Sequence, residues 1–245
     1  EKPSHPDLLD WLARRFIADG WSIKTLHRRI VLSSTYQQAV TASAETLRRD
    51  PENRLFSRAV VRRLEAETVR DALLAAGGQL DETMTGSLLK LKNRAYFFDH
   101  TSKDLTTYES RRRSLYLPVV RNNVFDLFQL LDFPDPAVST GDRATTVVAS
   151  QALLMLNSEF VMQAATGLAD RLLVLPGDDH QRLVMLYRIT FGREPTADEQ
   201  QADREFLARL VKLRADGAGG QGHHRNAWAT LCHVMLAANE FIYLR

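Results

Sequence analysis

The stretch from residue 143 to residue 173, RATTVVASQALLMLNSEFVMQAATGLADRLL, constrains the fold of this chain more than any other. Its apolar side chains recur every three or four positions, and residues 152–156 are apolar almost all round. This pattern predicts a helix over about 145–173 that is buried on most of its circumference. Gln151 and Asn157 flank the apolar run, and their amide groups need hydrogen-bond partners if they are buried.

Helical periodicity also marks most of the remaining chain. The clearest helix start is the pair Thr196 and Glu199, which has the spacing of a capping box, in which each side chain satisfies the other's free backbone amide. Further helices are expected from Pro6 to about Gly20, from Ser22 to about Tyr36, from Pro51 to Ala76, and over about 124–131, 179–191, 197–215 and 227–243.

The helix expected from Pro51 to Ala76 carries many charged residues between its apolar positions. Arg63 with Glu67, and Glu67 with Arg70, have the spacing of ion pairs along one helix face. We therefore expect these charges to lie on a solvated face.

The periodicity fails between residues 77 and 123. Alternating residues at 89–97 suit a short hairpin, and Pro118 favours an extended segment over a helix interior. The sequence thus predicts an all-α fold, a multi-helix orthogonal bundle around the helix at about 145–173, with 77–123 as an irregular insertion or lid. We expect residues 1–245 to form a single helical domain, and because Glu1 is not an initiator, a C-terminal fragment of a larger protein.

The composition limits the classes of function. The 32 basic and 30 acidic residues give a net charge of +2, which does not favour nucleic-acid binding despite several arginine pairs. No stretch approaches the run of about 18 apolar residues that a membrane span needs, so no span is expected. Cys232 is the only cysteine, so covalent haem attachment within this fragment is excluded, because it needs two cysteines and a histidine.

A set of motifs in fixed order is shared with one known family. They are HPDLLDWLA, GWSIKTLHRRIVLSSTYQQ, NRLFSRAVVRRLEAETVRDALL, RRSLYLPVVRN, LDFPDP, the string Arg143, Thr145, Gln151, Ala152, Leu153 and Asn157, YRITFGREPTADE and WATLCHVMLAANEFIYL. Over nearly its whole length the chain thereby resembles the planctomycete-specific C-terminal domain of unknown function, which usually ends large proteins that carry a planctomycete-type cytochrome c domain. Where that family commonly has a Gly-Gly-Pro-like turn, this chain has Met84 to Leu88 instead.

The resemblance implies a mostly helical, extracytoplasmic module, periplasmic or secreted, whose targeting signal lies outside this fragment. It implies haem only in another domain of the same polypeptide, and no cofactor in this fragment. It supplies no catalytic residues.

Two kinds of catalytic or metal site can be weighed from the residues themselves. His223, His224, Cys232 and His233 could bind a metal, but Cys232 and His233 are adjacent on a helix and point about 100° apart, so no metal site is expected. Carboxylates and a histidine suited to acid chemistry are Asp99, His100, Glu109, Asp132 and Asp135. The two aspartates more simply accept backbone amides in the proline-bounded turn at 132–136, or pair with an arginine, so no catalytic residue is assigned.

Polar residues around this turn and the central helix form a candidate ligand-binding set. An arginine fork matches carboxylate, sulfate or phosphate groups, which suggests an anionic saccharide; the alternative is that the arginines pair internally with carboxylates. The set comprises Arg112, Arg113, Arg121, Asp132, Asp135, Arg143, Gln151 and Asn157.

Two functions follow from these patterns. The leading hypothesis is a non-catalytic helical docking or scaffold module that binds other domains of its own polypeptide. The alternative is a ligand-binding or hydrolytic unit for an anionic polysaccharide, with its cleft between residues 77–123 and the central helix. That alternative requires Arg113, Asp132, Arg143 and Gln151 to line one open pocket.

Overall fold

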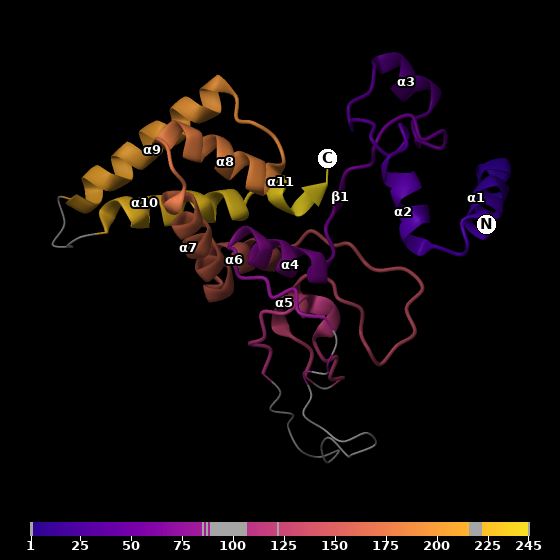
Figure 1. Cartoon of the computed structure of the whole chain (residues 1–245), viewed down its shortest axis with the longest axis horizontal. Coiled ribbons are helices and arrows are strands. Elements are labelled where there is room, and N and C mark those ends of the chain that lie inside the picture. The colour runs from indigo at the N-terminus through magenta and orange to yellow at the C-terminus, as the bar shows by residue number, and fades with distance from the viewer. Residues whose placement is uncertain are drawn as a thin grey trace, which may run out of the picture. The chain divides into compact units, whose positions relative to one another are not determined.

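The computed structural model describes residues 2–84, 86, 88, 107–121, 123–215 and 222–244 (Figure 1). Within these residues the chain forms eleven α-helices, one 3-10 helix and a two-stranded sheet, which confirms the predicted all-α class. The chain divides into two compact units, residues 1–62 with 243–245, and residues 63–242. That both units form a single domain, and that the bundle is orthogonal, stay predictions. The hairpin predicted at 89–97 lies outside the described residues.

The first unit contains three short helices, α1 (Pro6–Ala18), α2 (Ile23–Val31) and α3 (Ala44–Arg49). Gly20 and Trp21 both have positive φ, 70° and 60°, and form the corner between α1 and α2. An ion pair between Arg29 and Asp19, with Nε and Oδ2 2.8 Å apart, joins these two helices. None of the residues of the three helices is buried, so the apolar side chains of this unit do not enclose a core of their own.

The prediction of one long helix from Pro51 to Ala76 is wrong. The Asp50 carboxylate accepts hydrogen bonds from the backbone N–H groups of Arg54 at 2.7 Å and Leu55 at 2.8 Å, which holds a loop instead. Asn53 and Phe56, with φ of 55° and 53°, then turn the chain out of the helical region. The helix begins only at Ala66, as α4 (Ala66–Ala76), after the strand β1 (Arg62–Arg63), which pairs with β2 (Tyr243–Leu244).

The core of the second unit is built on three helices, α4, α7 (Glu159–Val174) and α10 (His223–Leu236). Helix α7 packs against both α10 and α4, and α10 also packs against α9 (Ala197–Ala215) (Figure 1). A fully buried leucine or valine contributes about 1.5–3 kcal/mol to folding. The completely or almost completely buried side chains include Val69, Leu73, Val161, Leu168, Leu172, Trp228, Leu231 and Leu236.

The end of α4 approaches α7 through two glycines. A Cβ atom on Gly167 would lie 2.6 Å from the carbonyl oxygen of Gly77 and 2.7 Å from Nε2 of Gln79. A Cβ on Gly77 would lie 2.9 Å from the carbonyl oxygen of Ala164. The helices therefore reach this distance only because neither residue has a side chain.

The central helix predicted over about 145–173 is two helices, α6 (Ala149–Asn157) and α7, separated by Ser158. Ser158 has an extended backbone, with φ −70° and ψ 128°, so the apolar positions on its two sides no longer share one face. Helix α7 is buried as predicted, but α6 buries only Gln151 and Met155. The prediction of burial over most of the circumference is therefore wrong for α6.

The structure confirms the predicted capping box of Thr196 and Glu199 at the start of α9. The Glu199 carboxylate accepts from Thr196 N–H at 2.7 Å, and Thr196 Oγ1 accepts from Glu199 N–H at 3.2 Å. Asp178 and Gln181 form a second capping box, at the start of α8 (Asp179–Phe191), and Gly192 ends that helix in the left-handed conformation. The short elements α5 (Asp126–Leu130), α11 (Asn239–Ile242) and the 3-10 helix η1 (Ser114–Tyr116) complete the second unit. Across the described ranges, none of the helices combines the length and the hydropathy that crossing a membrane demands.

Candidate functional site

Four polar residues from distant parts of the second unit meet around one carboxylate, and we name them the Asp132 cluster: Arg63, Asp132, Thr146 and Gln151. Arg63 Nη2 lies 2.5 Å from Asp132 Oδ2, and Nη1 donates to the carbonyl of Thr146 at 2.7 Å. The Thr146 hydroxyl and backbone N–H donate to the same carboxylate at 2.7 and 2.8 Å, and Gln151 Nε2 lies 3.2 Å from it. The cluster thus joins β1, the turn after α5, the segment before α6 and α6 itself.

The cluster is largely shielded from water. The side chains of Arg63 and Asp132 are 6% and 15% exposed. Burial is the largest single influence on the Asp132 carboxyl and raises its pKa, but the hydrogen bonds from Thr146 and Arg63 together lower the pKa below its ordinary value. Asp132 also has a positive φ of 61°, which aspartate and asparagine tolerate better than most residues. The carboxylate therefore stays charged and holds the elements around it.

A second internal group, the Arg70 cluster, comprises Arg70, Asp71 and Ser114. The Arg70 side chain is completely buried, donates to the carbonyls of Arg112 at 2.9 Å and of Ser110, and lies 3.2 Å from Asp71 Oδ1. Asp71 in turn accepts from the backbone N–H of Ser114 at 2.9 Å. These contacts fix the segment before η1 against α4.

The ion pairs predicted along one helix face are replaced by others. Arg63 pairs with Asp132 rather than with Glu67, and Arg70 lies in the core rather than on a solvated face. Glu67 pairs instead with Arg143, whose Nη1 lies 2.8 Å from Glu67 Oε2. The prediction is wrong for Arg63 because this residue lies on β1, outside the helix, and wrong for Arg70 because this residue lies on the buried face of α4.

The remaining predicted binding residues are distributed over several places. Arg112 donates to the carbonyls of Thr83 and Gly86 and lies with its guanidinium 4.2 Å from the Tyr116 ring centroid, while Arg113 lies 5.5 Å from the same ring.

The others make local contacts or lie at the surface. The Asp135 carboxylate accepts from Ala137 N–H at 2.8 Å, and the amide of Asn157 donates to the carbonyl of Leu153 at 3.1 Å. Arg121 is exposed. The structure therefore brings Asp132 and Gln151 together, but it places neither Arg113 nor Arg143 with them.

The histidines and the cysteine weighed as metal ligands lie along α10. Cys232 is buried, and burial raises the pKa of its thiol far above the ordinary value. His233 bonds the carbonyl of Met155 at 2.9 Å, and His224 lies 3.3 Å from Asp179. The described part of the chain contains no group of three or more His, Cys, Asp or Glu side chains that could hold a metal ion.

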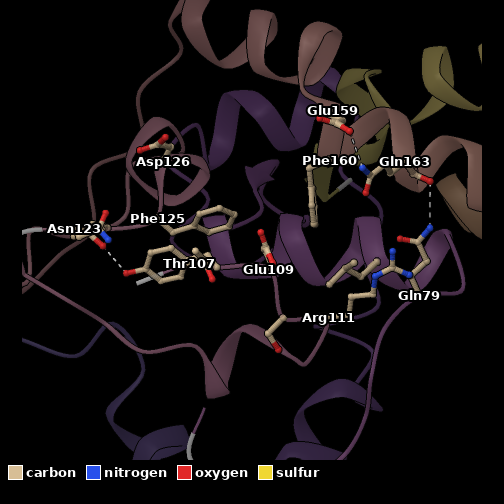
Figure 2. Close-up of a pocket in the computed structure, with 14 residues that line it drawn as sticks. Gln79, Thr107, Glu109, Arg111, Asn123, Phe125, Asp126, Glu159, Phe160 and Gln163 are labelled. Atoms are coloured by element: carbon tan, nitrogen blue, oxygen red, sulfur yellow. Dashed lines mark hydrogen bonds between the residues drawn. The ribbon is translucent and has the colours of Figure 1, made fainter. Parts of the chain in front are cut away.

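A cleft of about 740 Å³ lies beside α7, within the size range typical of ligand sites. We call it the α7 cleft; its walls are residues 107–111 and 123–126, with Leu74, Gln79, Glu159, Phe160 and Gln163. Figure 2 shows Glu109 between Phe125 and Phe160 in this view, with amide groups of Gln79 and Gln163 at one end. The cleft occurs where the alternative hypothesis expected one, but none of the eight predicted binding residues lines it.

Several residues of these sites have no role in a site that the sequence predicts, and Arg63 and Arg70 are expected on a solvated helix face instead. Arg63, Arg70 and Thr146 take part in the two clusters, and Gln79, Phe160 and Gln163 line the α7 cleft. The spacing of Phe160 and Gln163, three apart on α7, is the one local signal for a shared face. Of the residues considered for acid chemistry, Glu109 lines the cleft, whereas Asp99 and His100 lie outside the described residues.

Exposed apolar side chains concentrate in the first unit. On α1 and α2 they form a surface that we name the α1–α2 apolar surface: Leu8, Leu9, Trp11, Ile17, Ile23, Ile30 and Val31, with exposed fractions from 37% to 61%. Apolar patches on the surface of soluble proteins mark interaction sites.

Comparisons with known proteins bear on the family of the chain. No curated protein matches the chain, and no solved structure matches it. One family model matches residues 1–207, and its description is "PSD1: Protein of unknown function (DUF1553)". Because this match spans most of the 245 residues, the chain belongs to the DUF1553 family of proteins of unknown function.

Proposed function

We propose that this chain is a non-catalytic docking module that binds another domain of its own polypeptide through the α1–α2 apolar surface. The observation that supports it is that α1, α2 and α3 bury none of their residues, although α1 and α2 carry large apolar side chains on regular helical faces. Complete burial of such a side chain contributes about 1.5–3 kcal/mol, and because these side chains are 37% to 61% exposed, a partner that covers them gains about half of that for each.

The setting of this module follows from the family resemblance. We propose that the parent polypeptide is extracytoplasmic and carries a cytochrome c domain, in which any haem would be bound, and that the planctomycete-specific family is the narrower family of this chain. The module would then position that domain rather than take part in its chemistry.

The alternative of a unit for anionic polysaccharides has weaker support. The arginines that would bind sulfate or carboxylate groups contact protein acceptors instead: Arg143 pairs with Glu65 and Glu67, and Arg112 donates to backbone carbonyls. An anionic ligand would have to replace these contacts before it could bind.

Hydrogen–deuterium exchange of α1 and α2 tests the docking proposal. In the intact parent polypeptide we expect slow exchange of these helices, and in the isolated chain fast exchange, because the partner covers the apolar surface only in the former. Leu9→Asp in the parent should restore fast exchange, while Leu213→Asp, which changes a similarly exposed leucine on α9, should not. Slow exchange already in the isolated chain would show that its own residues cover the surface, and the proposal would fail.

A further inference from the structure

The lining of the α7 cleft includes charged side chains that neither internal cluster uses. The side chains of Glu109, Arg111 and Asp126 make no hydrogen bond or ion pair with any described residue. By contrast, the polar groups of the Asp132 cluster are joined to one another. Polar groups that converge on a cleft without a protein partner are available to a ligand.

The charge of the lining narrows the ligand class. The charged side chains of the lining are three carboxylates, those of Glu109, Asp126 and Glu159, and one guanidinium, that of Arg111. A sulfated or carboxylated ligand would meet net repulsion at this place. A hydroxyl group both donates and accepts, so a ligand rich in hydroxyls can satisfy the acceptor-only carboxylates and the donor-only guanidinium together.

The aromatic side chains supply the apolar part of the cleft. Phe125 is held by the Tyr108 ring, stacked with a centroid distance of 5.0 Å, and by Phe128, which meets it edge-on at 5.2 Å. Phe160 stands on α7, and the guanidinium of the buried Arg70 lies 5.8 Å from its ring centroid. Rings held by such contacts give a rigid surface for the C–H groups of a sugar ring at little entropic cost.

We propose that the α7 cleft binds a neutral saccharide. Glu109 and Asp126 accept hydrogen bonds from its hydroxyl groups, Arg111 donates to its oxygen atoms, and Phe125 and Phe160 contact its C–H face. This assignment is independent of the docking proposal, because the cleft lies in the second unit and the α1–α2 apolar surface in the first.

The test uses the complete chain of 245 residues on an array of neutral, sulfated, uronic-acid and amino-sugar oligosaccharides, with spermine as a cationic probe. At least one neutral oligosaccharide should bind, and calorimetry should then measure its Kd. Glu109→Gln and Arg111→Gln should each weaken that Kd about tenfold, the loss expected for a hydrogen bond to a charged group. Glu52→Gln, the same change at an exposed carboxylate of the first unit, should leave it unchanged.

Three outcomes would overturn the proposal. The first is that no neutral oligosaccharide saturates the protein at concentrations up to about 10 mM. The second is that only spermine or only sulfated glycans bind. The third is that Glu109→Gln binds as tightly as Glu52→Gln, with circular dichroism showing both variants folded, since the saccharide would then bind elsewhere.

Discussion

Asp132→Asn is the substitution that most directly tests whether the Asp132 cluster stabilises the fold. Asparagine has nearly the same shape and tolerates the positive φ of 61°, so the change removes the charge without adding backbone strain. It leaves the Arg63 guanidinium, with a side chain 6% exposed, without its counter-charge. The new amide group also places a donor where the carboxylate accepted from Thr146 and Gln151.

The expected loss can be estimated from these contacts. Breaking a buried ion pair by removing one partner costs about 3–5 kcal/mol. Because the Asp132 side chain is still 15% exposed, water recovers part of this, and we expect the free energy of unfolding to fall by about 3 kcal/mol. Asp135→Asn is the matched control in the same turn. The Asp135 carboxylate accepts a hydrogen bond from Ala137 N–H, and the substitution should cost about 1 kcal/mol or less.

Urea unfolding followed by tryptophan fluorescence measures the effect. Trp228 is completely buried in the second unit, whereas Trp11 and Trp21 are exposed, so a change in emission reports chiefly on the unit that contains the cluster. Arg63→Met combined with Asp132→Asn should cost less than the sum of the two single changes, because the double variant leaves no unpaired charge. Equal losses for Asp132→Asn and Asp135→Asn would refute the reasoning.

Two further predictions concern the second unit. Gly167→Ala should lower the free energy of unfolding by about 1–3 kcal/mol, because its Cβ would lie 2.6 Å from the carbonyl oxygen of Gly77. Gly141→Ala is the control and should change the free energy of unfolding little, because no atom lies within 4 Å of the added Cβ. Equal melting temperatures for the two variants would contradict this prediction. The hydrogen bonds from Arg193 lower the pKa of Glu199 from 4.5 to about 2, so the stability that this group contributes should be complete above pH 4.5 and be lost as pH falls toward 2. Melting temperatures across this pH range should fall less steeply for Glu199→Gln than for the wild type, and parallel curves would rule the mechanism out.

Local signals explain which parts of the fold the sequence could predict. The capping box of Thr196 and Glu199 involves residues three apart, so its geometry is set almost entirely by the residues themselves. The sequence favours a helix for the loop after Asp50, because Pro51 fits the first turn of a helix as well as it fits this turn. The loop forms instead of the helix because the Asp50 carboxylate accepts hydrogen bonds from two later backbone N–H groups.

The site depended on contacts that sequence spacing does not encode. Arg63 and Asp132 are 69 positions apart, and Arg63 and Thr146 are 83 apart, so no helical or strand period relates them. Arg70 has the sequence surroundings of an exposed helix residue, and its burial follows from the carbonyl groups of Ser110 and Arg112 that face it. The position of the α7 cleft could be predicted, but its lining could not.

The three uncovered helices of the first unit also bear on the lifetime of the protein. Helices of 13, 9 and 6 residues are too short to persist in water without tertiary packing. A chain that has lost its proposed partner would therefore present cleavable backbone at residues 2–62, while the core formed by α4, α7 and α10 stays closed. Proteases would remove such unassembled copies first, so the amount of the module would follow the amount of its partner.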